Sequence, residues 1–223
     1  MERQATQRVG ILGGTGDQGR GLAIRWASAG VSVIIGSRDA ARAAAAAAEV
    51  SAIVGPTADV TGAANTECAA AADVVVAAVP WASHGETLTG VAAHLVDKVL
   101  IDCVNPLGFD RQGPYVLPVP EGSAAQQAAH LLPQTTVVAA FHHVSAKVLG
   151  DMSITDVGLD VLVLAADREA AAVVMELADL IGGARGVYAG RLRNAASVEG
   201  LTANLIAINR RYKAHSSVRI TGI

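Results

Sequence analysis

A glycine-rich turn near the N-terminus constrains the fold of this chain more than any other segment. The sequence VGILGGTGDQGRGLA sets Gly14, Gly16 and Gly19 in the spacing G-x-G-x-x-G, directly after the apolar run Val9–Leu12. Apolar side chains then recur at helical intervals, so the segment predicts a strand, a tight turn and a helix. In that setting the first glycine permits the turn, the second lets a pyrophosphate approach the backbone, and the third packs helix against strand. The pattern predicts a dinucleotide site with its phosphates at the helix N-terminus.

The rest of the chain alternates short β-branched runs with helical stretches, which is typical of βαβ units around a parallel sheet. The predicted strands cover residues 8–12, 32–35, 59–61, 74–79, 99–103, 136–140, 161–164 and 186–188. The predicted helices cover residues 18–29, 40–50, 66–72 (capped by Asn65), 86–94, 123–132, 168–181 (capped by Asp167) and 195–213. Residues 108–122 are rich in Gly and Pro and are expected to form a long loop.

This order of elements predicts an α/β fold. It is a Rossmann-type doubly wound, mainly parallel sheet with a small C-terminal extension that ends in a helix. Residues 1–141 are expected to form the dinucleotide-binding domain and residues 142–223 a smaller C-terminal region. About 80 residues are few for an independent catalytic domain, so we expect the C-terminal region to complete a site begun by the first domain.

The end of the second predicted strand indicates which dinucleotide is bound. An NAD-preferring protein usually places Asp or Glu there for the ribose 2′-hydroxyl, whereas this chain has Ser37 and Arg38, with Arg42 one helical turn later. A guanidinium pairs with a phosphate that a carboxylate would repel. The sequence therefore favours NADP, with the alternative that Arg38 and Arg42 are ordinary surface charges.

Few residues are available for acid–base chemistry. The chain has no Tyr-x-x-x-Lys, G-x-S-x-G or HExxH pattern, which leaves hydrolysis and metal catalysis without support. The candidates are His84, His142 and His143, and the last two follow the predicted strand 136–140. Each could equally be a hydrogen-bonded structural residue. A protein with so few acid–base residues suits a reaction between two redox cofactors, because the cofactors themselves carry the chemistry. We therefore predict no catalytic side chain and no metal site.

Composition narrows the partners and the compartment. With 17 Lys+Arg against 20 Asp+Glu and 3% aromatic residues, the chain has neither the positive field nor the stacking surface for nucleic acid. No apolar run reaches the roughly 18 residues of a membrane helix. The polar N-terminal residues lack the pattern of an export signal, and the isolated Cys68 and Cys103 suit a reducing compartment as buried, inert thiols. We expect a cytoplasmic protein without a membrane or nucleic-acid partner.

Five segments together resemble a known family. LGGTGDQGRGLA, GSRDAAR, AVPWASH, FHHVSA and VEGLTANLIAINRR are similar to the F420-dependent NADP oxidoreductases, over nearly the whole chain. The resemblance implies hydride transfer between NADP(H) and the 8-hydroxy-5-deazaflavin coenzyme F420. It implies direct transfer from ring to ring, without an obligatory side-chain acid or base. Independently of the resemblance, we expect a homodimer, with the apolar stretch of residues 201–208 in the last predicted helix as its candidate contact.

The resemblance assigns cofactor contacts to residues of this chain. The implied NADP loop and 2′-phosphate pocket comprise Gly14, Thr15, Gly16, Asp17, Gln18, Gly19, Ser37, Arg38 and Arg42. The implied nicotinamide side comprises Val79, Pro80, Trp81, Ser83, His84, Asn105 and Pro106, and the two rings would meet near His142, Val144, Ser145 and Ala146. Candidates for receiving the acidic tail of F420 are Lys147, Arg191, Arg193, Arg210 and Arg211.

Protein families with other functions share the glycine-rich dinucleotide fingerprint. It is also similar to NADPH-dependent imine reductases such as pyrroline-carboxylate reductase, and to the NADPH domain of membrane metalloreductases. The former carry a larger helical C-terminal domain, and the latter continue into transmembrane helices. A third alternative is a non-catalytic module that senses NADPH and regulates a partner.

Overall fold

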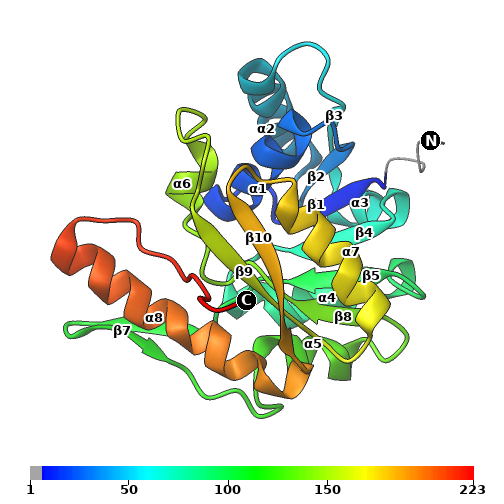
Figure 1. Ribbon diagram of the computed structural model, residues 1–223. Helices are drawn as coiled ribbons and strands as arrows, with labels where there is room; N and C mark the ends of the chain where they lie inside the picture. The colour runs from blue at the N-terminus through cyan, green and yellow to red at the C-terminus, as the bar shows by residue number, and fades with distance from the viewer. Residues whose placement is uncertain (1–6) are drawn as a thin grey trace.

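The computed structural model describes residues 7–223 and contains one eight-stranded sheet (Figure 1). Its strands are β1 (Val9–Leu12), β2 (Val33–Ser37), β3 (Val60–Ala64), β4 (Val74–Ala77), β5 (Val99–Asp102), β8 (Thr136–Ala139), β9 (Leu159–Ala165) and β10 (Ala184–Gly190). The order is β10-β9-β8-β5-β4-β1-β2-β3, and every neighbouring pair is parallel except β8 and β9. The predicted Rossmann-type, mainly parallel sheet is confirmed.

Helices cover both faces of the sheet. They are α1 (Asp17–Ser28), α2 (Ala40–Val54), α3 (Asn65–Ala71), α4 (His84–Val91), α5 (Ala124–Leu131), α6 (Ala146–Gly150), α7 (Arg168–Asp179) and α8 (Ala195–Tyr212). Short 3-10 turns η1 (Trp81–Ser83), η2 (Ala92–His94) and η3 (Leu192–Asn194) complete the list. Apolar residues of α1, α2 and α7 form one core with the sheet, and those of α3, α4 and α5 form a second core on the opposite face. Within residues 7–223, no helix combines the length and apolar character needed to cross a membrane.

The structure differs from the sequence prediction at three places: residues 108–122, α6 and the start of α3. The predicted loop 108–122 contains most of a hairpin of β6 (Leu107–Asp110) and β7 (Gly113–Val116). Its turn forms because the carboxylate of Asp110 accepts from two backbone N–H groups, and Gly113 has φ of 123°. The short helix α6 was not expected. Asn65 begins α3 instead of capping it, whereas Asp167 caps α7 as predicted.

Two helices lie unusually close to neighbouring backbone. Gly62 of β3 faces Ala43 of α2 so closely that a Cβ at position 62 would overlap the Ala43 backbone. At Gly21 of α1, an added Cβ would lie 2.6 Å from the Cβ of Leu149 in α6. Arg25 reinforces that second contact, because its buried guanidinium donates to four carbonyl oxygens at 2.7–2.8 Å. The acceptors are Val148, Leu149, Asp151 and Ile154.

The C-terminal region is continuous with the sheet. β8 and β9 share only the pairs Val138–Ala165 and Ala139–Leu164, and β10 then runs parallel to β9. Helix α8 follows and lies beside the β6–β7 hairpin, at the lower left of Figure 1. The division into domains 1–141 and 142–223 stays a prediction.

Candidate functional site: a cavity at the carboxyl edge of the sheet

A cavity of about 830 Å³ lies where β1, β2, β4 and β5 end. Open α/β sheets bind ligands at this edge. The predicted site residues that line the cavity are Thr15, Gly16, Asp17, Gln18, Ser37, Arg38, Arg42, Val79, Pro80, Trp81, Ser83, Asn105 and His142. Helix α8 adds Thr202 and Ile206, which the sequence analysis did not single out. The structure therefore brings the glycine turn, the arginines and part of the C-terminal region to one cavity.

The glycine turn has room for a ligand in front of it. The left-handed residue is Gly13, with φ of 70°, and not Gly14, to which we assigned the tight turn. Gly19 packs on Gly14, where an added Cβ would lie 2.7 Å from the Gly14 Cα, which fits the predicted close packing of helix and strand. At Gly16 an added Cβ would find no atom nearer than 3.5 Å. The backbone at Gly16, which precedes α1, is thus open to an anion.

Two arginines stand at one end of the cavity. Arg38 and Arg42 are exposed, and within residues 7–223 neither forms an ion pair. Asp39 lies between them but accepts hydrogen bonds from the N–H groups of Ala41 and Arg42, which makes it the cap of α2. The acidic side chain is therefore committed to the helix, and the guanidinium groups are available to an anionic ligand.

Asn65 contributes a second polar group to this end. It follows β3, lines the cavity, and its Oδ1 is buried without a hydrogen-bond partner in the described structure. An unpaired buried acceptor costs about 1–3 kcal/mol, so this atom is suited to a donor from a ligand. The sequence pattern indicated only a helix cap at Asn65. Its place at the carboxyl end of a strand was the signal for a site residue.

The other end of the cavity is formed by the segments after β4, β5 and β8. Trp81 and Asn105 face it from the first two segments, and His142 from the third. The carbonyl oxygen of His142 accepts from Asn105 Nδ2 and Thr202 Oγ1, both at 2.9 Å. Phe141, just before it, has a left-handed φ of 64°, a strain that is common at binding sites. Both ring nitrogens of His142 are buried without a partner in the described structure.

Burial keeps His142 and His143 neutral. Desolvation lowers the pKa of each to about 4 from 6.5, and for His143 the neighbouring His142 adds to the effect. His143 Nε2 accepts from the N–H of Leu162 at 3.3 Å, as an uncharged ring can. Neither histidine is therefore charged at neutral pH.

These two histidines predict an acid-sensitive fold. Between about pH 6.5 and pH 4 the unfolded chain protonates them and the folded chain does not, so stability falls as the pH falls. Each contributes a slope of about 1.4 kcal/mol per pH unit in that window. In urea unfolding from pH 7 to pH 4.5, the His142→Asn/His143→Asn variant is expected to lose stability less steeply than the wild type. His130→Gln, at an exposed position of α5, should match the wild type, and equal slopes for all three proteins would contradict the prediction.

Some predicted site residues lie outside the cavity lining. Gly14 and Gly19 pack against each other within the glycine turn, and His84 is wholly buried beneath the lining residues. The others outside the lining are Pro106, Val144, Ser145 and Ala146, and the basic candidates Lys147, Arg191, Arg193, Arg210 and Arg211. Cys68 and Cys103 are buried thiols, as expected, although Cys103 also lines the cavity. Desolvation raises the pKa of Cys68 to about 12 and that of Cys103 as well.

Comparison with known proteins places the chain among reductases. The family model for NADP oxidoreductases that depend on coenzyme F420 matches residues 8–106. The F420-dependent NADP reductase of Methanothermobacter thermautotrophicus is 42% identical over 229 residues, which cover 100% of this chain and 98% of that protein. The chain belongs to this family. A crystal structure from Arthrobacter sp. FB24, provisionally described as an F420-dependent NADP-reductase, has a TM-score of 0.81 at 28% identity and covers 97% of this chain and 100% of its own.

This chain matches the alternative families over a smaller share of their length than it matches the F420-dependent NADP reductases. The metalloreductase STEAP3 of Rattus norvegicus is 32% identical to 89% of this chain, which corresponds to 37% of that protein. An imine reductase of Bacillus cereus shares the fold, with a TM-score of 0.61 at 17% identity, and 63% of its chain is covered. Both likenesses are to part of a longer protein, whereas the family relatives match from end to end.

Proposed function

We propose that this chain transfers hydride between NADP(H) and coenzyme F420. Family membership over the full chain supports the activity. The observation that carries the proposal is one cavity whose lining, judged within residues 7–223, has guanidinium groups without ion pairs at one end and a buried, unpartnered polar group at each end. A cavity of about 830 Å³ is in the size range of cofactor sites, and these groups suit a phosphorylated ribose at one end and a polar, planar ring at the other.

The residues present fit NADP. Ser37, Arg38 and Arg42 would hold the 2′-phosphate, and the open backbone before α1 would receive the pyrophosphate. Val79, Trp81 and Asn105 would flank the nicotinamide. The remaining lining residues of the glycine turn, together with Pro80, Ser83 and His142, would complete the enclosure. The NADP contacts follow the sequence prediction, and their support is that these residues share one cavity.

The protein's contribution to the reaction is position and shelter from water. NADPH and F420 supply the chemistry of hydride transfer themselves. The chain would hold the two reacting carbons at about 3–3.5 Å and exclude water, without a side-chain acid or base. His142 and His143 support this proposal, because with a pKa of about 4 neither ring is protonated at neutral pH and each is a weak base.

Further parts of the proposal concern F420 and assembly. Val144, Ser145 and Ala146 would support the place where the two rings meet, and Pro106 the nicotinamide side, although none of the four lines the cavity itself. The basic candidates named above would attract its acidic tail. A homodimer is supported by exposed Phe109, Tyr115 and Tyr212 on the hairpin and α8, since exposed apolar groups favour association. We also propose a cytoplasmic location, supported by two free, buried cysteines.

One assay tests the activity. NADPH mixed with oxidised F420 and the protein is expected to bleach the visible absorbance of the deazaflavin, because hydride transfer breaks the conjugation of its ring system. NADH should act at least about 10-fold more slowly, because it lacks the phosphate that would pair with the arginines. FMN in place of F420 is the second comparison arm. Tight binding of NADPH without bleaching would favour a sensing module, and reduction of a cyclic imine instead would favour the imine reductases.

A further inference from the structure

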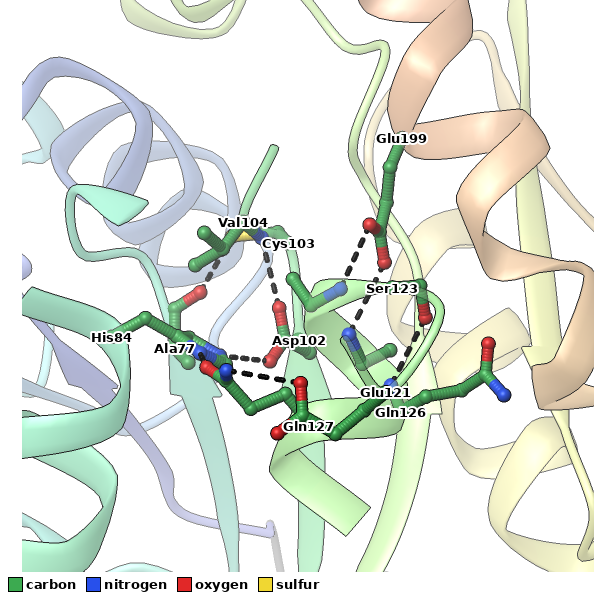
Figure 2. A network of polar contacts seen from close by, with 12 residues as sticks. Ala77, His84, Asp102, Cys103, Val104, Glu121, Ser123, Gln126, Gln127 and Glu199 are labelled. Carbon is green, nitrogen blue, oxygen red and sulfur yellow. Dashed lines mark hydrogen bonds and ion pairs between the residues drawn. The ribbon is translucent and has the colours of Figure 1, made fainter. Parts of the chain in front are cut away.

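Figure 2 shows a polar network around His84 and Asp102. The network adjoins the cavity lining at Trp81, whose ring is next to that of His84. His84, the first residue of α4, is 0% exposed. Its Nε2 lies 2.6 Å from Oδ2 of Asp102, at the end of β5, and its Nδ1 lies 3.0 Å from Oε1 of Gln127 on α5. The Gln127 amide is oriented by its own Nε2, which donates to Glu121 at 3.3 Å. Both partners of His84 are therefore acceptors, and the ring satisfies both only as an imidazolium that donates from each nitrogen.

The imidazolium contacts both segments that form this wall. The Asp102 carboxylate holds the ring with Oδ2, while its Oδ1 accepts from the N–H of Val104 at 3.0 Å. Val104 and Asn105 line the cavity from this segment. On the other side, the His84 ring lies 5.5 Å from the Trp81 ring, between centroids, at an angle of 33°. The network therefore joins the turn after β4 to the segment after β5.

The charges that face His84 are acidic. Asp102 contacts it from β5, Glu121 acts through Gln127, and Glu199 approaches from α8. Glu199 is itself fixed, because it accepts from the N–H groups of Ala124 and Ala125 at the start of α5. Burial opposes the charged ring, but the hydrogen bond and charge of Asp102, with Gln127 and Glu199, outweigh it and raise the pKa of His84. Burial also raises the pKa of Glu199, to about 7.

We propose that His84 is a positioning residue for hydride transfer. Held between Asp102 and Gln127, it fixes the spacing between the Trp81–Ser83 turn and the segment from Cys103 to Asn105. This inference rests on the proposed function, which places the nicotinamide between these two segments. When His84 loses its second ring proton, one of its nitrogens can no longer donate to the acceptor that it faces. The hydrogen-bonded connection between the two segments is then broken. A displacement of about 1 Å at the reacting carbons costs about 100-fold in rate, whereas NADP binding at the distant phosphate end is unaffected.

The proposal predicts a split between rate and affinity. In single-turnover experiments with NADPH and F420, the wild-type hydride-transfer rate should fall as the pH rises through the His84 pKa, which lies above 6.5. His84→Gln should be about 10- to 100-fold slower at pH 7 and lack that ionisation. The Kd of NADPH, measured by its own fluorescence, should change by less than about 3-fold, since the arginine end is intact. His130→Gln on the exposed face of α5 is the matched control and should behave as the wild type.

A double variant separates positioning from folding. Asp102→Asn and His84→Gln each leave an unmatched buried group, but together they restore a neutral hydrogen-bonded pair. The double variant should therefore be no slower than the slower single variant, and its rate should not titrate. A rate that equals the wild type in folded His84→Gln, with only its melting temperature lowered, would overturn the positioning role.

Tryptophan fluorescence gives a readout that needs no turnover. A protonated imidazole beside an indole quenches it, so Trp81 emission should rise with the same midpoint as the rate falls, in the wild type but not in His84→Gln. The chain has two tryptophans, and Trp26 is buried against Phe141, away from this network. Failure of the wild type to bleach F420 would reject the proposed function. Bleaching with a pH profile that is the same in wild type and His84→Gln would reject this inference alone.

Discussion

Arg38→Ala is expected to reduce kcat/KM for NADPH by about 100-fold and to leave kcat/KM for NADH within about 3-fold. A hydrogen bond to a charged group contributes about 1.5–3 kcal/mol, and only NADPH carries the phosphate that would accept it. The Arg38 guanidinium is exposed and forms no ion pair within residues 7–223, so its removal breaks no ion pair of the described structure. Arg38→Ala/Arg42→Ala should lower the NADPH value further. Initial rates with both dinucleotides at several salt concentrations provide the measurement.

Arg20→Ala is the matched control for this experiment. Arg20 lies on α1, pairs with Glu49 at 3.0 Å and with Asp17 at 3.7 Å, and does not line the cavity. Its loss should not change the ratio of NADPH to NADH activity. The salt dependence of the NADPH KM should weaken in Arg38→Ala, because screening acts on the lost charge. Equal losses with both dinucleotides would show that Arg38 stabilises the loop instead of reading the phosphate.

Arg25→Ala is expected to lower the free energy of unfolding by about 4 kcal/mol, or the melting temperature by about 10 °C. The side chain is 6% exposed and donates to four carbonyl oxygens around the end of α6. Truncation removes this donor from the buried carbonyl oxygens of Val148 and Leu149, and it opens a cavity beside Leu149. Arg25→Lys should recover only part of the loss, because one ammonium cannot reproduce the planar fork of donors. Urea and thermal unfolding measure both variants.

The same control serves the stability experiment. Arg20 is on the same helix, but its ion pairs with Asp17 and Glu49 are largely exposed, so Arg20→Ala should cost less than about 1 kcal/mol. A loss of under 1 kcal/mol for Arg25→Ala would mean that water replaces the guanidinium at the α6 carbonyls.

The parts of the site that could be predicted are local in sequence. The strand, glycine turn and helix of residues 9–28 form one continuous pattern, and Ser37 and Arg38 directly follow the apolar part of β2. Here neighbouring residues decide the structure, so spacing and residue type suffice. The same reasoning predicted the alternation of strands and helices and the cap at Asp167.

The parts that were missed depend on distant segments. His84 and Asp102 are 18 residues apart and meet only because β4 and β5 are adjacent in the sheet. Thr202 reaches the carbonyl of His142 across 60 residues, by way of the last two strands. The hairpin β6–β7 was hidden by its Gly and Pro content, which is typical of loops and of tight hairpin turns alike. Pairings of this kind leave no periodic trace in the sequence.

We expect Gly62, which has no side chain, to influence the choice of coenzyme through its contact with helix α2. Ala43 of α2 packs on the backbone of β3 at Gly62, so the position of the neighbouring Arg42 depends on an edge strand whose own residues, 60–64, do not line the cavity. A methyl group there would slide the helix outward and carry the guanidinium with it. Efforts to re-engineer this enzyme for a cheaper dinucleotide should therefore vary residues 37, 38 and 42 on a fixed scaffold. In a selection of random variants for altered cofactor preference, substitutions at position 62 should appear although this residue does not line the cavity.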